Sequence, residues 1–433
     1  MIGLTWWLLG CGSEAPPPVE PEPAPEPVVA RAEPPAVPKV PYVQWSLPSR
    51  KGKTPNPLGR TDKNLKKQLG IVRARLVKLV RERGRNPLSP WAVAHAMLAL
   101  GPELTLQGVN RPAIDYLAEE YGRRTRVGRD ELWRFPPKVG NQLVDVHTDL
   151  LLKAFTEGGL SPDRAVVVAG EPTTLGELYR NSLHRAWVDG RRTGFQERGF
   201  NDAPWALQAL SAWAPKDLSW TAQGGHEMTL QDFTRALRNV IASETAEMKA
   251  ARNAGASMKK DTRKGFFKYT CGGQHMLQGL TYAVARGFGD EADKTEVCDQ
   301  IELLTWRIDV ELNAIDPLIR QGTPQIQLLL LVQRLKFLGH TLETVHKAAA
   351  MGVCSLTSEQ VAASERVARE LVLTVDGLNR LGAFDNLDRI AVDRGFERLR
   401  KGGGSQILLD MIGDSAHAIR GIDMATGKGS ILY

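Results

Sequence analysis

Cysteine is scarce in this 433-residue chain, and its spacing excludes two classes of protein. The four cysteines are Cys11, Cys271, Cys298 and Cys354. Four are too few for a disulfide scaffold of this length. No two of them have CxxC spacing, so a CxxC…CxxC zinc finger is excluded. An exported chain can pair Cys298 with Cys354, but their separation in sequence decides nothing.

Long apolar runs and a one-sided charge are also missing from the body. No run of 18 apolar residues occurs there, so the body has no predicted membrane span. The net charge of +7 is concentrated: residues 50–85 carry +11 and residues 12–49 carry −3, which leaves about −1 elsewhere. A neutral body gives no reason to expect a nucleic-acid partner.

The amino terminus is similar to a bacterial lipoprotein signal. Residues 1–11 place an apolar run before Leu8-Leu9-Gly10-Cys11, and a proline-rich stretch follows. The run is short and has no basic residue, so we expect the true start to lie upstream. A chance apolar start is the alternative. The interpretation predicts lipidation of Cys11, a membrane anchor as partner, and a location in the bacterial cell envelope, on the periplasmic or the outer side.

Two segments of contrasting composition follow. Residues 14–48 hold 12 of the 26 prolines, so residues 12–49 are predicted to be a disordered, proline-rich tether. Residues 50–86 form a basic segment with apolar residues at helical spacing. This amphipathic helix either lies on an anionic surface or is the first helix of the body.

The body, residues 87–433, is predicted to be all-α. Apolar residues recur three and four positions apart in segment after segment, and only 165–174 is expected to be extended. Short helices that are apolar all round alternate with longer, charged ones. This alternation favours an α/α toroid of about six helix pairs, with an α-solenoid as the alternative.

Two histidine motifs are the strongest candidates for chemistry. CGGQH places Cys271, Gly272 and Gly273 before His275, and GHTLE places Gly339 before His340 and Glu343. Each histidine is expected in the first turn of a buried helix, facing one central mouth. Glycine there permits a tight turn and a close backbone approach. His340 and Glu343 are three residues apart on one helical face, which suits either an oriented acid/base pair or two metal ligands.

The alternatives for these residues are structural. A buried histidine is more often a packing residue, and a buried cysteine often acts as a small apolar group. No recognised ligand spacing supports a zinc site of Cys271, His275 and His340, so no metal or other cofactor is predicted. The motif DVHTD, residues 145–149, is expected to be solvated or to cap a helix. Tryptophans offer stacking surfaces for sugars, and the expected ligand-binding set is Cys271, Gly272, Gly273, Gly339, Trp91, His95 and Trp205.

Two resemblances rest on these motifs. CGGQHMLQGLTYAV, FLGHTLETV and AGEPTTLGEL together resemble a family of exported helical proteins of planctomycete- and myxobacterium-like bacteria over roughly residues 87–420. That resemblance implies an architecture and a pocket but no particular activity. GHTLE alone is faintly similar to N-acylglucosamine 2-epimerase-type α/α barrels, in which histidines move protons on a sugar. This resemblance implies that His340 is an acid or base oriented by Glu343, with His275 or His417 as its partner. Two functions are therefore open: histidine-based catalysis on a carbohydrate or cell-wall glycan, of the epimerase, lyase or glycosidase kind, or a non-catalytic envelope binding module.

The predicted lipid anchor has a direct test. Expressed from its true start, the chain should partition into detergent after globomycin-sensitive processing, and Cys11→Ala should release it as a soluble species. A wild-type chain found in the soluble cytoplasmic fraction contradicts the anchor.

Overall fold

The computed structural model describes residues 39–48, 50–59, 62–128, 130–190, 192–195, 199–399 and 403–433. Cys11, the signal segment and most of the proline-rich tether lie outside the described residues. Helices dominate the described part of the chain, as predicted, and 14 of them are found there. They are α1 Lys63–Arg83, α2 Pro90–Leu100, α3 Ala113–Tyr121, α4 Leu150–Glu157, α5 Leu175–Arg185, α6 Ala203–Trp213, α7 Leu230–Asn253, α8 Gln274–Ala285, α9 Glu291–Gln321, α10 Pro324–Ala350, α11 Ser358–Arg380, α12 Leu387–Ala391, α13 Arg394–Leu399 and α14 Gly403–Ala425.

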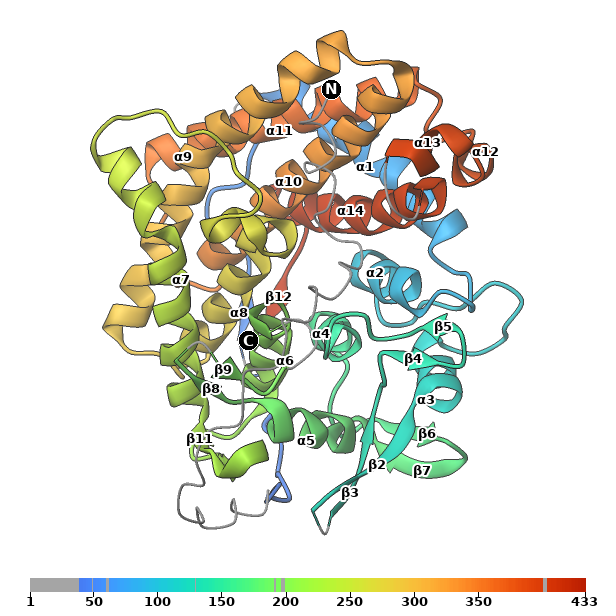
Figure 1. The fold of residues 1–433 in the computed structure, drawn as a ribbon, viewed down its shortest axis with the longest axis vertical. Coiled ribbons are helices and arrows are strands. Elements are labelled where there is room, and N and C mark those ends of the chain that lie inside the picture. Colours follow the sequence, from blue (N-terminus) through green and yellow to red (C-terminus); the bar gives the residue numbers. More distant parts are fainter. Residues whose placement is uncertain are drawn as a thin grey trace, which may run out of the picture.

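Short strands form six two-stranded antiparallel sheets in the same residues. The pairs are β1 Lys51–Gly52 with β12 Ile431–Leu432, β2 Arg123–Val127 with β3 Asp130–Arg134, β4 Lys138–Val139 with β5 Gln142–Leu143, β6 Ala165–Val168 with β7 Glu171–Thr174, β8 Val188–Asp189 with β9 Arg192–Thr193, and β10 Ser219–Thr221 with β11 Glu227–Thr229. The extended piece predicted at 165–174 is the β6–β7 hairpin. The other hairpins were not predicted. In Figure 1 most hairpins lie in the lower half, and α9, α10, α11 and α14 lie in the upper half.

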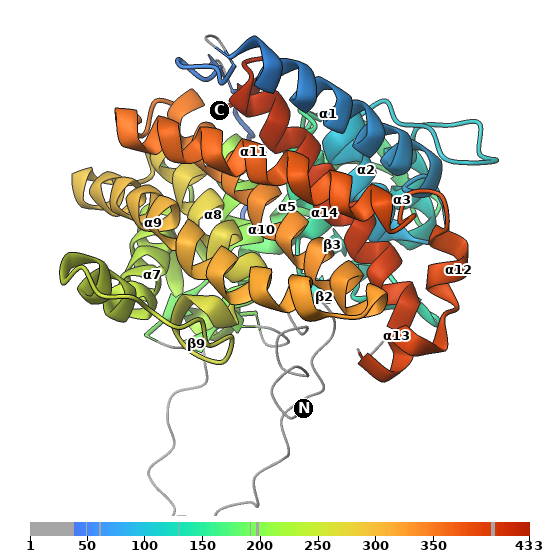
Figure 2. The ribbon, with the colours of Figure 1, turned by 90° about the horizontal axis from the view of Figure 1, so that it is seen from above.

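Six buried helices contact one another in a closed order. α2 contacts α4, α4 contacts α6, α6 contacts α8, α8 contacts α10, α10 contacts α14, and α14 contacts α2. Every residue of α6 is buried, as is nearly all of α10 from Leu328 onward. Longer helices with one buried stripe cover them; α9 and α11, for example, both pack on α10 (Figure 2). The predicted alternation of buried and covering helices is therefore present.

The α10–α14 crossing brings two backbones into contact. A Cβ atom on Gly339 of α10 would lie 2.9 Å from the Cα atom of Ala418 on α14. A Cβ atom on Gly421 would lie 2.6 Å from the carbonyl oxygen of Gly339. Glycine is needed at both positions because any side chain would push the helices apart.

The segment before the body packs on its surface. Val40 and Val43 are buried, Trp45 packs edge-on against Tyr179, and Ser46 donates a hydrogen bond to the Trp213 carbonyl. Residues 39–48 therefore lie against the body, although the sequence placed them in the disordered tether. The proline content predicted disorder, but the valines and Trp45 supply apolar surface whose burial favours packing against the body.

The basic amphipathic segment contains α1, which packs on α14, α11 and α2. Leu65, Leu76 and Val80 on its apolar stripe are fully buried. Of the two alternatives, this is the arrangement of a first helix of the body. None of the helices in the described residues is both long and apolar enough to cross a membrane.

The glycine at the helix crossing generates a stability prediction. Gly339→Ala should lower the free energy of unfolding by about 1–3 kcal/mol, because overpacking forces two backbones apart. Gly70→Ala in α1 is the matched control, since nothing lies within 4 Å of its Cβ position. The control should be neutral or stabilising by about 0.5–1 kcal/mol through helix propensity. Urea denaturation followed by circular dichroism measures both; equal effects would contradict the close crossing.

Candidate functional site

Five of the eight histidines of the chain converge at the centre of the body. They are His95 of α2, His147 just before α4, His275 of α8, His340 of α10 and His417 of α14, and all are buried. The ring centroids of His340 and His417 are 3.9 Å apart, and those of His275 and His340 are 5.0 Å apart. Distant segments of the chain thus form one imidazole cluster.

A left-handed turn brings Cys271 to this cluster. Cys271, Gly272 and Gly273 have φ of 52°, 61° and 79°, so three successive residues are left-handed. This conformation costs a cysteine about 1–2 kcal/mol. A Cβ atom on Gly272 would lie 2.6 Å from Nη2 of Arg307, and one on Gly273 would lie 2.5 Å from the ring of Phe266. The glycines of CGGQH therefore provide both the turn and the close approach predicted for them.

His275 follows the turn as the second residue of α8, as predicted. His340 does not begin a helix, so that prediction was wrong: it lies in the middle of the 27-residue α10. The preceding Gly339 lies at a helix crossing and not at the turn predicted for it. Its role is to let α14 approach, which places His417 against His340.

Backbone carbonyls fix two of the imidazoles. Nδ1 of His340 donates to the Lys336 carbonyl at 2.8 Å, and Nδ1 of His95 donates to the Trp91 carbonyl at 2.8 Å. A carbonyl only accepts, so Nδ1 carries the proton and Nε2 has the lone pair. Nε2 of His340 and Nδ1 of His275 have no hydrogen-bond partner among the described residues.

Carboxylates fix the orientation of two further imidazoles. Nδ1 of His417 donates to Oε2 of Glu343 at 2.6 Å, and Nδ1 of His147 donates to Oδ1 of Asp202 at 3.2 Å. Glu343 therefore orients His417 and not His340, contrary to the sequence prediction. It lies one turn beyond His340 on α10, where it faces α14.

Glu343 belongs to a buried charge network below the histidines. Lys347 donates to Glu343 at 3.0 Å, to Glu157 at 2.9 Å and to the Gln278 side chain at 3.1 Å. Arg420 donates to Glu157 at 2.7 Å, and Lys153 lies 3.2 Å from the same carboxylate. Three cations thus surround two carboxylates, which compensates charges that are costly to bury alone.

Burial sets the protonation of the cluster. It lowers the pKa values of His95, His275 and His340 well below the ordinary histidine value, and neighbouring imidazoles and Lys153 lower them further. Burial raises the pKa of Glu343, but Lys347 and His417 outweigh it and hold the pKa well below its usual range. At neutral pH the imidazoles of His95, His275 and His340 are therefore neutral and can accept protons or bind metals, and they lie above an ionised carboxylate.

The space between these side chains is very small. The cavity has a volume of about 20 Å³. It is lined by the five histidines together with Trp91, Leu150, Trp205, Thr270, Cys271, Asp410, Gly413 and Asp414. One water molecule needs about 10–15 Å³ measured in this way, so the cavity holds a water molecule or an ion and excludes a sugar ring.

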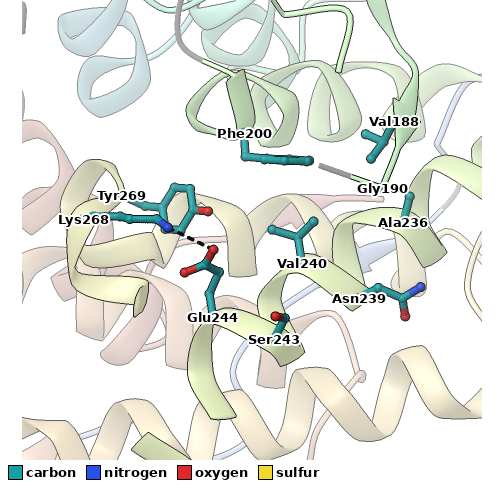
Figure 3. A pocket seen from close by; sticks show the side chains of 10 residues that line it. All are labelled: Val188, Gly190, Phe200, Ala236, Asn239, Val240, Ser243, Glu244, Lys268 and Tyr269. Atoms are coloured by element: carbon teal, nitrogen blue, oxygen red, sulfur yellow. Dashed lines mark hydrogen bonds and ion pairs between the residues drawn. The ribbon is translucent and has the colours of Figure 1, made fainter. Parts of the chain in front are cut away.

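A larger groove lies beside the cluster (Figure 3). Its volume is about 360 Å³, and it runs between α7, the β8–β9 hairpin and the residues before α8. Figure 3 shows the rings of Phe200 and Tyr269 at this groove and the ion pair of Lys268 with Glu244, whose atoms are 2.9 Å apart. Val188, Gly190, Ala236, Asn239, Val240 and Ser243 complete its lining.

Two short segments separate the groove from the cluster. Tyr269 lines the groove, while the next residues, Thr270 and Cys271, line the histidine cavity. Phe200 lines the groove, and Asp202 two residues later binds His147. The backbone N–H of Thr270 donates to the Asn201 side chain at 2.8 Å and joins the two segments.

The structure brings most of the predicted site residues together. Those at the cavity are Cys271, His275, His340, His417, Trp91, His95 and Trp205. Gly272 and Gly273 form the turn, Gly339 forms the crossing, and Glu343 lies behind His417. The residues missed are His147, Asp202, Asp410 and Asp414. The sequence did contain a pattern that indicates two of them: Asp410 and Asp414 recur with His417 at helical spacing on one face of α14.

The other residues considered in the sequence have structural roles. Asp145 accepts hydrogen bonds from the backbone N–H groups of Asp149 and Leu151, so DVHTD does cap a helix, but its carboxylates are buried and not solvated. Cys298 and Cys354, whose pairing the sequence left open, form a disulfide from α9 to the turn after α10.

Comparisons of the chain with protein-family models, curated proteins and solved structures found no match. The site is therefore interpreted from its own geometry.

The neutral state of the buried imidazoles predicts how stability depends on pH. Near pH 6.5 the unfolded chain binds protons that the folded cluster does not, so unfolding is favoured as the pH falls. Each such histidine should lower the free energy of unfolding by about 1.4 kcal/mol per pH unit below 6.5. The window from pH 7 to 5 lies above the titration of ordinary carboxylates.

Urea denaturation at pH 7, 6 and 5 measures this dependence. His340→Asn should flatten it, whereas His226→Asn, at a half-buried histidine stacked on Trp187 outside the cluster, should not. Identical slopes for wild type and His340→Asn would show that His340 is not held neutral.

Proposed function

We propose that the closed order of contacts among the six buried helices is an α/α toroid with six inner and six outer helices. The inner helices would be α2, α4, α6, α8, α10 and α14, and the outer helices α3, α5, α7, α9, α11 and α1. The contact of α14 with both α10 and α2 supports closure. In an open solenoid the first and last inner helices would be far apart.

We infer that this toroid carries a catalytic centre that acts on a carbohydrate or cell-wall glycan by histidine-based proton transfer. The observation that supports it most directly is the convergence of five buried histidines, two of them oriented by carboxylates. Packing alone does not require four oriented imidazoles from separate segments of the chain. An oriented neutral histidine is the usual general base of an enzyme.

His417 is the proposed base. Its Nδ1 proton is held by Glu343, so Nε2 has the lone pair and accepts a proton, from a water molecule in hydrolysis or from a carbon of the substrate in epimerisation or elimination. Glu343 stabilises the imidazolium that then forms, and Lys347 keeps Glu343 ionised. His340, stacked on His417, is the nearest imidazole through which the proton returns. The class of reaction is sugar epimerisation, elimination or hydrolysis.

The groove is the proposed binding site for the rest of the substrate. Its volume of about 360 Å³ is ligand-sized, and sugars stack on aromatic rings such as Phe200 and Tyr269. Asn239, Ser243, Glu244 and Lys268 offer hydrogen bonds for hydroxyl groups. Only one substituent would reach the histidines, through the wall formed by Asn201 and Thr270.

The location proposed for this reaction is the bacterial cell envelope. The lipobox-like residues up to Cys11 and the proline-rich stretch support a lipid-anchored domain. The Cys298–Cys354 disulfide is in keeping with an oxidising compartment. The two sequence resemblances agree with this proposal and add no further evidence to it.

A non-catalytic binding module is the second candidate. The observation that favours it is the difference in size between the open groove and the cavity of about 20 Å³ among the histidines. In that case the groove binds an envelope glycan and the histidines are structural.

The test uses the full-length chain in detergent with bacterial wall glycan fragments and acidic and neutral polysaccharides. Binding is measured by calorimetry, and products by mass spectrometry. We expect turnover that falls at least about 100-fold in His417→Asn. Phe200→Ala should raise KM more than it lowers kcat.

His346→Asn is the matched control. His346 is a fully buried histidine of α10 outside the cavity, hydrogen-bonded to Thr54, and its replacement should leave turnover intact. Binding that is lost in Phe200→Ala, without turnover by wild type, would favour the binding module. Absence of binding to any glycan would contradict both candidates.

A further inference from the structure

Cys271, His275 and His340 offer a set of metal ligands, and only His340 among them has a part in the proposed catalysis. One ligand atom from each lies within 4.8 Å of the other two. His275 is 4% exposed and His340 is 1% exposed, so both imidazoles are removed from solvent. A zinc ion with one sulfur and two nitrogen ligands holds them roughly 3.3–3.7 Å apart, as bond lengths of about 2.3 and 2.0 Å require. Metal binding therefore requires small side-chain rotations that bring the three atoms closer together than 4.8 Å.

The hydrogen bonding of the two imidazoles leaves ring nitrogens that suit a cation, and packing does not explain this arrangement. Nε2 of His340 has its lone pair toward the cavity, because Nδ1 donates to the Lys336 carbonyl. A metal-bound histidine usually has such a second hydrogen bond from its other nitrogen. A buried nitrogen without a partner costs about 1–3 kcal/mol, and both His275 and His340 have one. A bound cation would remove this cost.

The backbone provides an independent indication. Cys271 adopts a left-handed conformation that a cysteine rarely takes, and two left-handed glycines follow it. A strained backbone conformation persists only where the surrounding structure fixes it, and such residues cluster at functional sites. Its effect here is to direct the sulfur of Cys271 toward His275 and His340.

We propose that Cys271, His275 and His340 bind one divalent transition-metal ion of the zinc class. One thiolate with two imidazoles suits zinc and cobalt and does not suit magnesium or calcium, which take oxygen ligands. The three residues line the cavity of about 20 Å³, which has the size of one ion or one water molecule. Three protein ligands and one open position are typical of catalytic zinc sites.

The surroundings compensate part of the charge of the ion. The thiolate offsets one of its two positive charges, and Asp410 and Asp414 line the same cavity, where Nζ of Lys336 lies 4.0 and 3.9 Å from their carboxylates. His417 lies next to the site, with its ring centroid 3.9 Å from that of His340 and 5.2 Å from that of His275. The metal site does not depend on the proposed glycan chemistry, because a structural ion would bind without any turnover.

The test is metal binding by the untagged, full-length chain. After chelator treatment and dialysis, zinc should bind with a stoichiometry of one per chain in competition with a chromophoric chelator. Cobalt should give a thiolate-to-metal charge-transfer band and the intense visible bands of four-coordinate geometry. Zinc should also raise the melting temperature, because an ion that binds only the folded state stabilises it.

Variants then assign the ligands. Cys271→Ser should remove the charge-transfer band, and His275→Asn and His340→Asn should each weaken zinc binding at least about 100-fold. His346→Asn, the buried control on α10, should bind zinc as wild type does.

Three results would overturn the proposal. They are no stoichiometric zinc on the wild-type chain, a cobalt spectrum without a thiolate band, or unchanged zinc affinity in Cys271→Ser. The cobalt spectrum of wild type decides the question even if a histidine variant fails to fold. Metal binding without glycan turnover would support this site and leave the proposed function unsupported.

Discussion

The buried carboxylate of Glu343 is the group on which the rest of the site depends. It accepts hydrogen bonds from His417 at 2.6 Å and Lys347 at 3.0 Å, and Arg420 lies 3.5 Å away. A carboxylate without solvent is costly by several kcal/mol unless cations and donors surround it. Those partners lie on α10 and α14, and Lys347 and Arg420 also reach Glu157 of α4. The same contacts therefore hold three buried helices together and fix the tautomer of His417.

This network can form only because α10 and α14 approach so closely. Gly339 and Gly421 leave no side chain at the crossing, and the backbones touch there. His340 is next to Gly339, and His417 lies one turn before Gly421, so the crossing itself stacks the two imidazoles at 3.9 Å. Packing and chemistry are coupled at this point: a change that separates the helices also separates the histidines from each other and Glu343 from His417.

Helices and cluster residues were predictable to different extents. Apolar spacing predicted the helices because their burial is periodic, and the histidines stood out as polar residues in apolar segments. The hairpins were missed because strands such as Arg123–Val127 are short and rich in charge. The position of His340 was predicted wrongly because a glycine is typical both of a turn and of a helix crossing, and the sequence alone does not distinguish the two. The pairing of Glu343 with His417 joins residues 74 positions apart, and only the tertiary structure can show it.

The cavity among the histidines and the groove beside it differ in what they can hold, and this limits the chemistry. The cavity among the histidines accepts a water molecule or an ion, whereas the adjacent groove accepts a molecule of several rings or residues. Between them lie Asn201 and Thr270, joined by one hydrogen bond of 2.8 Å. A substrate in the groove meets the histidines only if this contact opens or if a narrow substituent passes it. Asp202 and Cys271 belong to the two segments that form this wall, residues 199–202 and 268–271. An opening of the wall would therefore shift an orienting carboxylate and a strained cysteine together. Access and the arrangement of the reactive groups are thereby linked through the same two segments.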